Sequence, residues 1–253
     1  MPDFLFVHEG GHGKWQWEGV WGYLENARRS REALRHPTFL GWRQVLPDLP
    51  GHGPRFSPDS LQAPSADLCT QALVDAALQH GLRHPVLVAH GLTAALALRA
   101  SRLLKEGPTR LVLIAGVVPA PGRTPLQALP RVVRLALWAQ GVLPAPKGYV
   151  RLHREFVVKV LASDMDYPRA AALVAKRLTP LPLAPFRHPL PAEALSPPCP
   201  VTYVVLTRDR FYPPSLQRQA AGRLGAEVVE VEAGHEAPLS RPEAIGEVLL
   251  RWG

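Results

Sequence analysis

Three segments of the chain carry residue types that could perform nucleophilic or acid–base chemistry. In the first, an apolar run enters the five residues Ala89-His90-Gly91-Leu92-Thr93, and a segment rich in small residues follows. This is the setting of a nucleophile elbow, where the pattern G-x-S-x-G places a serine at a strand-to-helix corner. The serine position here is Gly91, which has no side chain. Acyl transfer by a serine at this position is therefore not expected.

The second and third segments supply an acid and a histidine. Asp209 follows the apolar run 201–206, and His235 follows the run 227–231. Asp209 could hold the imidazole of His235 in one tautomer, so that His235 acts as a general base. Taken singly, Asp209 could equally form a turn or an ion pair, and His235 could be a surface loop residue. The order elbow, acid, histidine, each after a successive strand, makes a strong joint signal.

A glycine-rich loop at 8–15 follows the first apolar run. The backbone N–H groups of Gly10 and Leu92 are candidate donors of an oxyanion hole, although a plain turn would carry the same glycines. Glu9 is an odd neighbour for such a hole, because its carboxylate would repel a developing oxyanion.

The elements that must position these residues alternate along the chain. Apolar strands that alternate with helices predict a mainly parallel sheet covered by helices on both faces, with ligands at the carboxyl ends of the strands. Strands are expected at 4–7, 43–46, 85–89, 111–115, 201–206 and 227–231, and helices within 15–34 and at 65–79, 92–105, 214–224 and 242–252.

The stretch 119–198 breaks this alternation. It is proline-rich at both ends, and its middle has helical periodicity at 126–140, 149–161 and 168–178. We therefore expect one α/β core, formed by 1–118 and 199–253, with a helical cap insertion at 119–198.

Two stretches extend the pattern to a known family. Residues 6–17 read FVHEGGHGKWQW and residues 48–53 read DLPGHG. With the segments around Asp209 and His235, they resemble the α/β-hydrolase superfamily, closest to its small-esterase and hydroxynitrile-lyase-like group. The resemblance covers essentially the whole chain outside the cap. It implies the α/β-hydrolase fold.

The sequence departs from that family at four positions. Gly91 replaces the serine, Ala89 and Thr93 replace the flanking glycines, and Glu9 replaces a glycine in the facing loop. The elbow backbone is strained for a side-chain-bearing residue by about 1–3 kcal/mol, which glycine relieves. Four changes around one site indicate a sequence that has left serine chemistry.

Two functions follow from this and stay open. In a serine-independent enzyme, His235 and Asp209 perform acid–base chemistry on a small, largely apolar ligand, Glu9 assists as a second acid–base group or as a partner of His235, and a cavity at Gly91 holds water or substrate. In a non-catalytic pseudoenzyme, the retained scaffold binds a ligand or partner. A displaced nucleophile is a weaker third alternative, since Thr93, His90 and Cys69 are all poorly placed. Side chains filling the space at Gly91 would argue against the enzyme.

Composition bounds the remaining properties. The 253 residues are 47% apolar, and the net charge of +8 comes from scattered arginines, so we expect diffuse surface charge and no nucleic-acid partner. No run is long enough to span a bilayer and no signal peptide is evident, so we expect no membrane partner and a cytoplasmic location. Cys69 and Cys199 predict neither a disulfide nor a functional thiol, and no metal or other cofactor is expected. The 28 prolines are typical of a rigid, thermostable chain, and homo-oligomer formation stays open.

Five aromatic residues of the second half could line an apolar pocket or belong to the core: Trp138, Tyr149, Phe156, Phe186 and Phe211.

Overall fold

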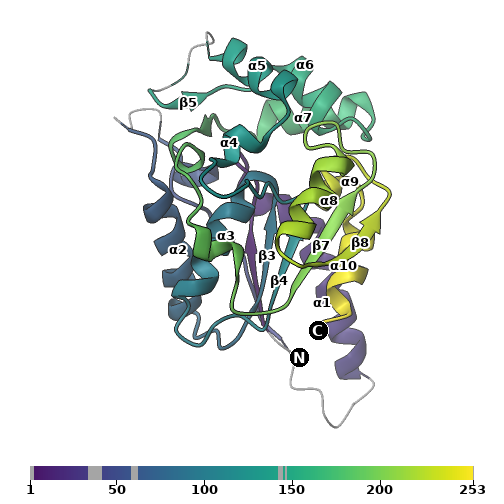
Figure 1. Ribbon diagram of the computed structural model, residues 1–253. Coiled ribbons are helices and arrows are strands. Elements are labelled where there is room, and N and C mark those ends of the chain that lie inside the picture. Colours follow the sequence, from purple (N-terminus) through teal and green to yellow (C-terminus); the bar gives the residue numbers. More distant parts are fainter. Residues whose placement is uncertain (1–2, 34–41, 58–61, 142–144, 146, 253) are drawn as a thin grey trace.

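A six-stranded parallel sheet forms the centre of the molecule (Figure 1). The computed structural model describes residues 3–33, 42–57, 62–141, 145 and 147–252. The strand order is β2-β1-β3-β4-β7-β8, and every neighbouring pair in this sheet is parallel. The strands are β1 (Phe4–Val7), β2 (Gln44–Val45), β3 (Val86–His90), β4 (Arg110–Ile114), β7 (Val201–Leu206) and β8 (Glu227–Val231).

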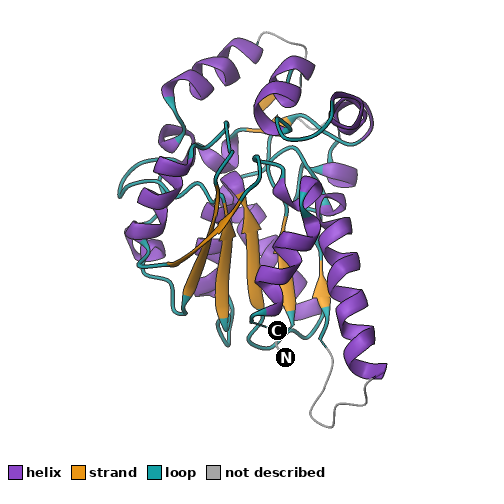
Figure 2. Ribbon diagram, turned by 90° about the vertical axis from the view of Figure 1, so that its right-hand side faces the viewer, coloured by secondary structure: helices purple, strands orange, loops and turns teal. Residues whose placement is uncertain are grey.

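Helices cover both faces of this sheet, as Figure 2 shows. Alternate residues of each inner strand point to opposite faces, and both sets are apolar, so each face buries its own core. On one face, Leu87 and Leu111 pack among residues of α2 (Ala66–Gln79), α3 (Ala94–Leu103) and α8 (Pro214–Arg223). On the other, Val88 and Val112 pack among residues of α1 (Glu18–Ala33) and α10 (Pro242–Leu250).

Short helices complete the core where the chain turns between strands and helices. They are η1 (Lys14–Trp17), η2 (Gly53–Arg55), η3 (Gly91–Thr93) and α9 (Ala237–Ser240). The core elements expected from the sequence agree with those observed to within two residues at each described end. Residue 34, the expected end of the first helix, lies outside the described residues.

We call residues 119–198 the cap, and its described residues lie over the carboxyl ends of the strands (Figure 1). The division of the chain into core and cap at these limits stays a prediction. The cap contains α4 (Pro125–Ala128), α5 (Arg131–Gln140), β5 (Tyr149–Val150), α6 (Arg154–Phe156), η4 (Val157–Leu161), α7 (Tyr167–Lys176), β6 (Leu181–Pro182), η5 (Ala184–Phe186) and η6 (Ala192–Leu195).

Two of the expected cap helices are wrong in extent. The helix expected at 126–140 is interrupted at Leu129–Pro130, because proline keeps the preceding residue extended; Leu129 has ψ 152°. The helix expected at 149–161 begins only at Arg154. Residues 149–150 form a strand instead, paired antiparallel with Leu181–Pro182.

Candidate active site

The loops that carry the predicted site residues meet at one edge of the sheet. Glu9 follows β1, Gly91 follows β3, Asp209 follows β7 and His235 follows β8. Because all of these strands run in parallel, their carboxyl ends lie at the same edge. The structure brings these four residues together, although 226 positions separate Glu9 from His235 in the chain.

Asp209 and His235 form the acid–histidine pair expected from the sequence. Nδ1 of His235 lies 2.8 Å from Oδ2 of Asp209, and both side chains are buried. Asp209 is held in turn by the backbone N–H groups of Phe211 and Tyr212, at 2.8 and 2.9 Å, and by the side-chain amide of Gln217 at 3.0 Å. The pair therefore keeps the geometry that orients a catalytic imidazole.

Gly91 keeps the backbone of an elbow without its side chain. Its φ of +55° lies in the left-handed region, which glycine adopts without strain. A Cβ built on Gly91 would overlap the carboxylate of Glu9 and lie 3.2 Å from Nε2 of His235. The cavity expected at Gly91 is therefore not found, because Glu9 occupies that space.

Glu9 also occupies the oxyanion hole expected between Gly10 and Leu92. Its Oε1 accepts hydrogen bonds from the backbone N–H of Gly10 at 2.5 Å and of Leu92 at 3.1 Å. Its Oε2 accepts from the N–H of Leu92 at 2.9 Å and lies 3.3 Å from Nε2 of His235. The N–H groups of Gly10 and Leu92 point to one place, where the Glu9 carboxylate accepts from both, and their use as an oxyanion hole stays a prediction.

This arrangement sets the charge state of His235. Burial alone would lower its pKa, but the carboxylates of Asp209 and then Glu9 outweigh burial and raise the pKa to about 10. The ring is thus an imidazolium at neutral pH, donating to one carboxylate from each nitrogen. An imidazolium has no free lone pair, so His235 would have to lose this proton before it could act as a general base.

A second buried ion pair lies beside the first and was missed in the sequence. Glu236 Oε1 lies 3.0 Å from Nε2 of His12, and both side chains are fully buried. Burial would raise the pKa of Glu236, but His12 and then His90 and His235 lower it to about 2. Its position next to His235 was the only available signal, since no sequence spacing relates it to His12.

Gln16 joins the two pairs. Its Oε1 accepts from the backbone N–H of Glu9 at 2.8 Å, and its amide donates to Glu236 at 3.1 Å and to Nδ1 of His90 at 3.0 Å. Nε2 of His90 donates to the backbone oxygen of His235 at 2.8 Å. Every hydrogen-bonding group of the Gln16 and His90 side chains has a partner, so this network holds the site in one arrangement.

Glu9, His90 and His235 place ligand atoms within 4.8 Å of one another, which is compatible with a metal site. Both ring nitrogens of His90 already make hydrogen bonds, and both nitrogens of His235 face carboxylates. A metal ion would have to displace these bonds, so the donor set does not favour one.

Thr93, Cys69 and His90, considered as alternatives to the missing serine, are poorly placed for nucleophilic attack. The hydroxyl of Thr93 donates to the backbone oxygen of His90 at 2.8 Å. Burial raises the pKa of the Cys69 thiol to about 12 and of the Cys199 thiol to about 11, so neither forms a thiolate at neutral pH. His90 packs behind His235, with ring centroids 4.6 Å apart.

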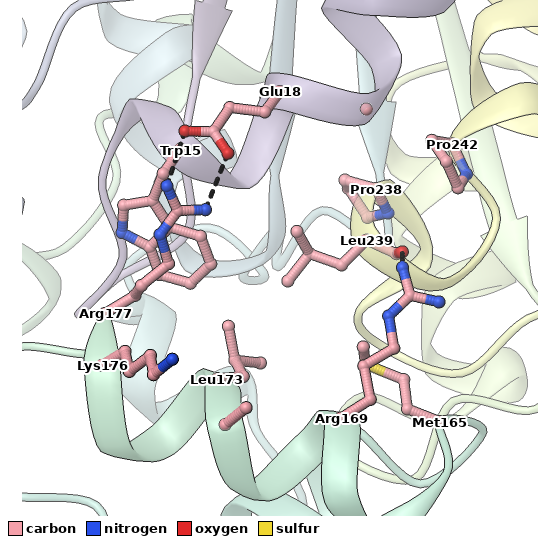
Figure 3. Close-up of a pocket in the computed structure, with 12 residues that line it drawn as sticks. Trp15, Glu18, Met165, Arg169, Leu173, Lys176, Arg177, Pro238, Leu239 and Pro242 are labelled. Atoms are coloured by element: carbon pink, nitrogen blue, oxygen red, sulfur yellow. Dashed lines mark hydrogen bonds and ion pairs between the residues drawn. The ribbon is translucent and has the colours of Figure 1, made fainter.

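A cavity of about 370 Å³ opens between α7 of the cap and the core, as Figure 3 shows. Its apolar wall includes Trp15, Leu173 and Leu239, and Trp15 packs against His12 with ring centroids 5.1 Å apart. Three cations also line the cavity: Arg169, Lys176 and Arg177. Arg177 pairs with Glu18 through two contacts of 2.7 Å, and Arg169 donates to the backbone oxygen of Leu239 at 2.7 Å.

The aromatic residues of the cap and its neighbouring loops divide between core and surface. Tyr149, Phe186 and Phe211 are buried, and Phe211 packs against the ring of His235 at 4.6 Å between centroids. Trp138 is 77% exposed and is not core.

The fold and the surviving acid–histidine pair define an α/β hydrolase scaffold. Residues 4–248 match the sequence profile of the family described as "Alpha/beta hydrolase family", and the chain belongs to that family. A comparison with curated proteins found no match.

Several solved structures share this fold over the whole chain. One is an extracellular α/β-hydrolase from a Paenibacillus species, described as sharing structural and functional homology with tobacco salicylic acid binding protein 2; it is 17% identical, with a TM-score of 0.81 over 100% of this chain and 99% of that one. A methylesterase from Arabidopsis is 21% identical, with a TM-score of 0.74 over 100% and 98%. A pyrethroid hydrolase from Sphingobium faniae is 22% identical, with a TM-score of 0.77 over 99% and 96%. At these identities the similarity shows the fold.

Within the described residues, the helices are too short or too polar to cross a bilayer.

Proposed function

We propose that this chain is a non-catalytic member of its family that binds a small, mostly apolar anion. The observation that supports a non-catalytic role is the position of the Glu9 carboxylate. It fills the nucleophile position at Gly91 and takes both N–H donors of the oxyanion hole, at 2.5 to 3.1 Å. An ester carbonyl has neither a nucleophile to meet nor a hole to enter.

Charge balance supports this reading of the site. The imidazolium of His235 lies between two carboxylates, and all three side chains are at least 96% buried. Breaking such a pair leaves an uncompensated buried charge, which is strongly destabilising. The former reaction centre thus acts as a structural ion cluster.

The cavity in Figure 3 supports the proposed binding of a small, mostly apolar anion. It combines an apolar wall with cationic groups, the pattern that suits an apolar molecule carrying one negative charge. Arg177 is already neutralised by Glu18 and Arg169 donates to the backbone oxygen of Leu239, whereas Lys176 has neither an ion pair nor a side-chain hydrogen bond with any described residue. Lys176 is therefore the cation best placed to meet a ligand's anionic group.

The binding test uses 1-anilinonaphthalene-8-sulfonate, an apolar anion whose fluorescence rises on binding. Ala172 lines the cavity and Ala175, one helical turn further along α7, does not. We expect Ala172→Trp to fill the cavity and weaken binding at least ten-fold, and Ala175→Trp to bind like the unmodified chain. Equal binding by all three proteins would contradict the cavity assignment.

The catalytic test measures hydrolysis of p-nitrophenyl acetate and butyrate by the unmodified chain. We expect no rate above that of buffer. Turnover that disappears in His235→Asn would contradict the proposal.

A second candidate function, acid–base catalysis without serine, is favoured by the Asp209–His235 distance of 2.8 Å. It requires Glu9 to leave His235 so that the imidazole can lose a proton. Bound ligand that is converted over time, followed by NMR and abolished by Asp209→Asn, would favour this candidate over simple binding.

A further inference from the structure

Helix α5 of the cap exposes apolar side chains on the face that points away from the protein. Val132, Leu135 and Trp138 are 72%, 64% and 77% exposed, while Val133 and Leu137 of the same helix are buried. The spacing of three residues places the exposed side chains along one stripe. Figure 1 shows α5 at the outer end of the cap, opposite the chain termini. An exposed stripe of this size on one helix is typical of an interaction surface.

The charge around this stripe is one-sided. Within the cap, from residue 119 to residue 154, the sequence contains six Lys or Arg and no Asp or Glu. The whole cap, 119–198, contains eleven Lys or Arg and four Asp or Glu, a net charge of +7 against +8 for the entire chain. The positive charge expected to be diffuse is therefore concentrated in the segment that carries the apolar stripe.

A groove of about 250 Å³ runs along one edge of α5. It is lined mainly by apolar residues, among them Leu126, Leu137, Trp138 and Val150. Arg134 and Arg187 also line it, and Nε of Arg134 has no hydrogen-bond partner among the described residues. An apolar chain could lie in such a groove with its anionic group at the arginines.

We propose that the α5 face of the cap docks onto the surface of an anionic lipid bilayer. A second copy of the chain does not suit this face, because two faces of like charge would repel each other. Nucleic acid would use the cations but not the apolar stripe. An anionic bilayer uses both: its head groups meet the cations, and its interface accepts a tryptophan and the neighbouring aliphatic side chains. The docking is peripheral and involves no spanning helix.

The test is co-sedimentation with vesicles of phosphatidylcholine alone and with vesicles that also contain about 30% phosphatidylserine. The two should differ strongly, because each cation near an anionic surface raises partitioning about five-fold. We expect binding only to the anionic vesicles, a blue shift of tryptophan fluorescence, and loss of binding in high salt. Leu135→Ser/Trp138→Ser should weaken binding at least ten-fold, and so should Arg131→Glu/Arg187→Glu.

Leu78→Ser is the matched control, because Leu78 is 62% exposed on α2 in the core. It should bind like the unmodified chain. All of these residues are on the surface, so the variants should fold, which circular dichroism checks. Failure to bind anionic vesicles, equal binding to neutral vesicles, or undiminished binding by Leu135→Ser/Trp138→Ser would overturn the proposal.

Discussion

Replacing Glu9 with glycine and Gly91 with serine in one chain should create ester hydrolysis that neither substitution creates alone. Gly91→Ser by itself places its Cβ where the Glu9 carboxylate lies, so the carboxylate would stay in the site and compete with an ester for the space and for the N–H donors. Glu9→Gly by itself frees the two N–H donors but leaves no nucleophile. Together they empty the oxyanion hole at Gly10 and Leu92 and place a hydroxyl beside Nε2 of His235, which would lie 3.2 Å from the new Cβ.

The expected size of the effect follows from the recovered parts. Each oxyanion-hole donor contributes about 10²–10³ in kcat, and two are released. His235 loses one of its two carboxylates, so its pKa falls and the ring can act as a base. We expect the double variant to hydrolyse p-nitrophenyl acetate at least about 10³-fold faster than either single variant, with a burst of nitrophenolate from an acyl-enzyme.

Stability limits the assay. A side chain at the φ of +55° costs about 1–3 kcal/mol. Removing the Glu9 carboxylate leaves His235 paired with Asp209, but it costs about 1–3 kcal/mol for each of the two buried N–H donors left without an acceptor. The total approaches the stability of an ordinary domain, so folding should be checked by circular dichroism and the assay run well below Tm. Adding Asp209→Asn should abolish the gain. A folded double variant at background rate, or an active Gly91→Ser single variant, would refute the reasoning.

Three further predictions concern stability and ionisation. The raised pKa of His235 stabilises the fold fully below pH 6.5, and this contribution is lost as pH rises toward about 10, by up to about 1.4 kcal/mol per pH unit. Burial lowers the pKa of His52 to about 4, so stability also falls as pH drops from 6.5 toward 4. Tm should therefore peak near pH 6.5, and a flat profile to pH 10 would contradict the ion cluster. Glu9→Gln removes one charge at constant shape and should lower the pKa of His235 by at least about one unit, measured by NMR of the ring, and an unchanged titration would show that the pair is weak. Gly10→Ala should destabilise by about 1–3 kcal/mol, since its Cβ would meet cap side chains, while Gly222→Ala in α8, with open space around it, should stabilise by about 0.5–1 kcal/mol; similar Tm shifts for both would contradict this packing.

The sequence was sufficient for the core because strand alternation and chain order are local signals. Runs such as 201–206 are apolar at nearly every position, which a strand buried on both faces requires. The acid and the histidine follow from the same signals, since parallel strands bring their ends to one edge. The cap was less predictable, because a short strand such as Tyr149–Val150 exists only through its partner at 181–182.

The sequence could not show which side chain fills the space at Gly91, because this depends on a tertiary contact. The sequence identified Gly91 as vacant and Glu9 as a possible partner of His235, and it left open whether a cavity or side chains occupy the space at Gly91. Only the fold shows that one residue occupies the space of the other. The buried partner of Glu236 likewise depends on a tertiary contact between residues 12 and 236.

The overlap between Glu9 and a Cβ at position 91 constrains how these residues can change. The Glu9 carboxylate and a Cβ at position 91 cannot share the same space, so a side chain at position 91 requires the carboxylate to move away from its two N–H donors and from His235. The absence of a side chain at position 91 is therefore what makes room for the carboxylate at position 9 in this arrangement. From the present sequence, a mutation that restores serine alone meets a steric block, and one that removes the carboxylate alone loses a buried ion pair and recovers no nucleophile. Each single substitution back is unfavourable, so glutamate at position 9 makes the return of a catalytic serine at position 91 harder.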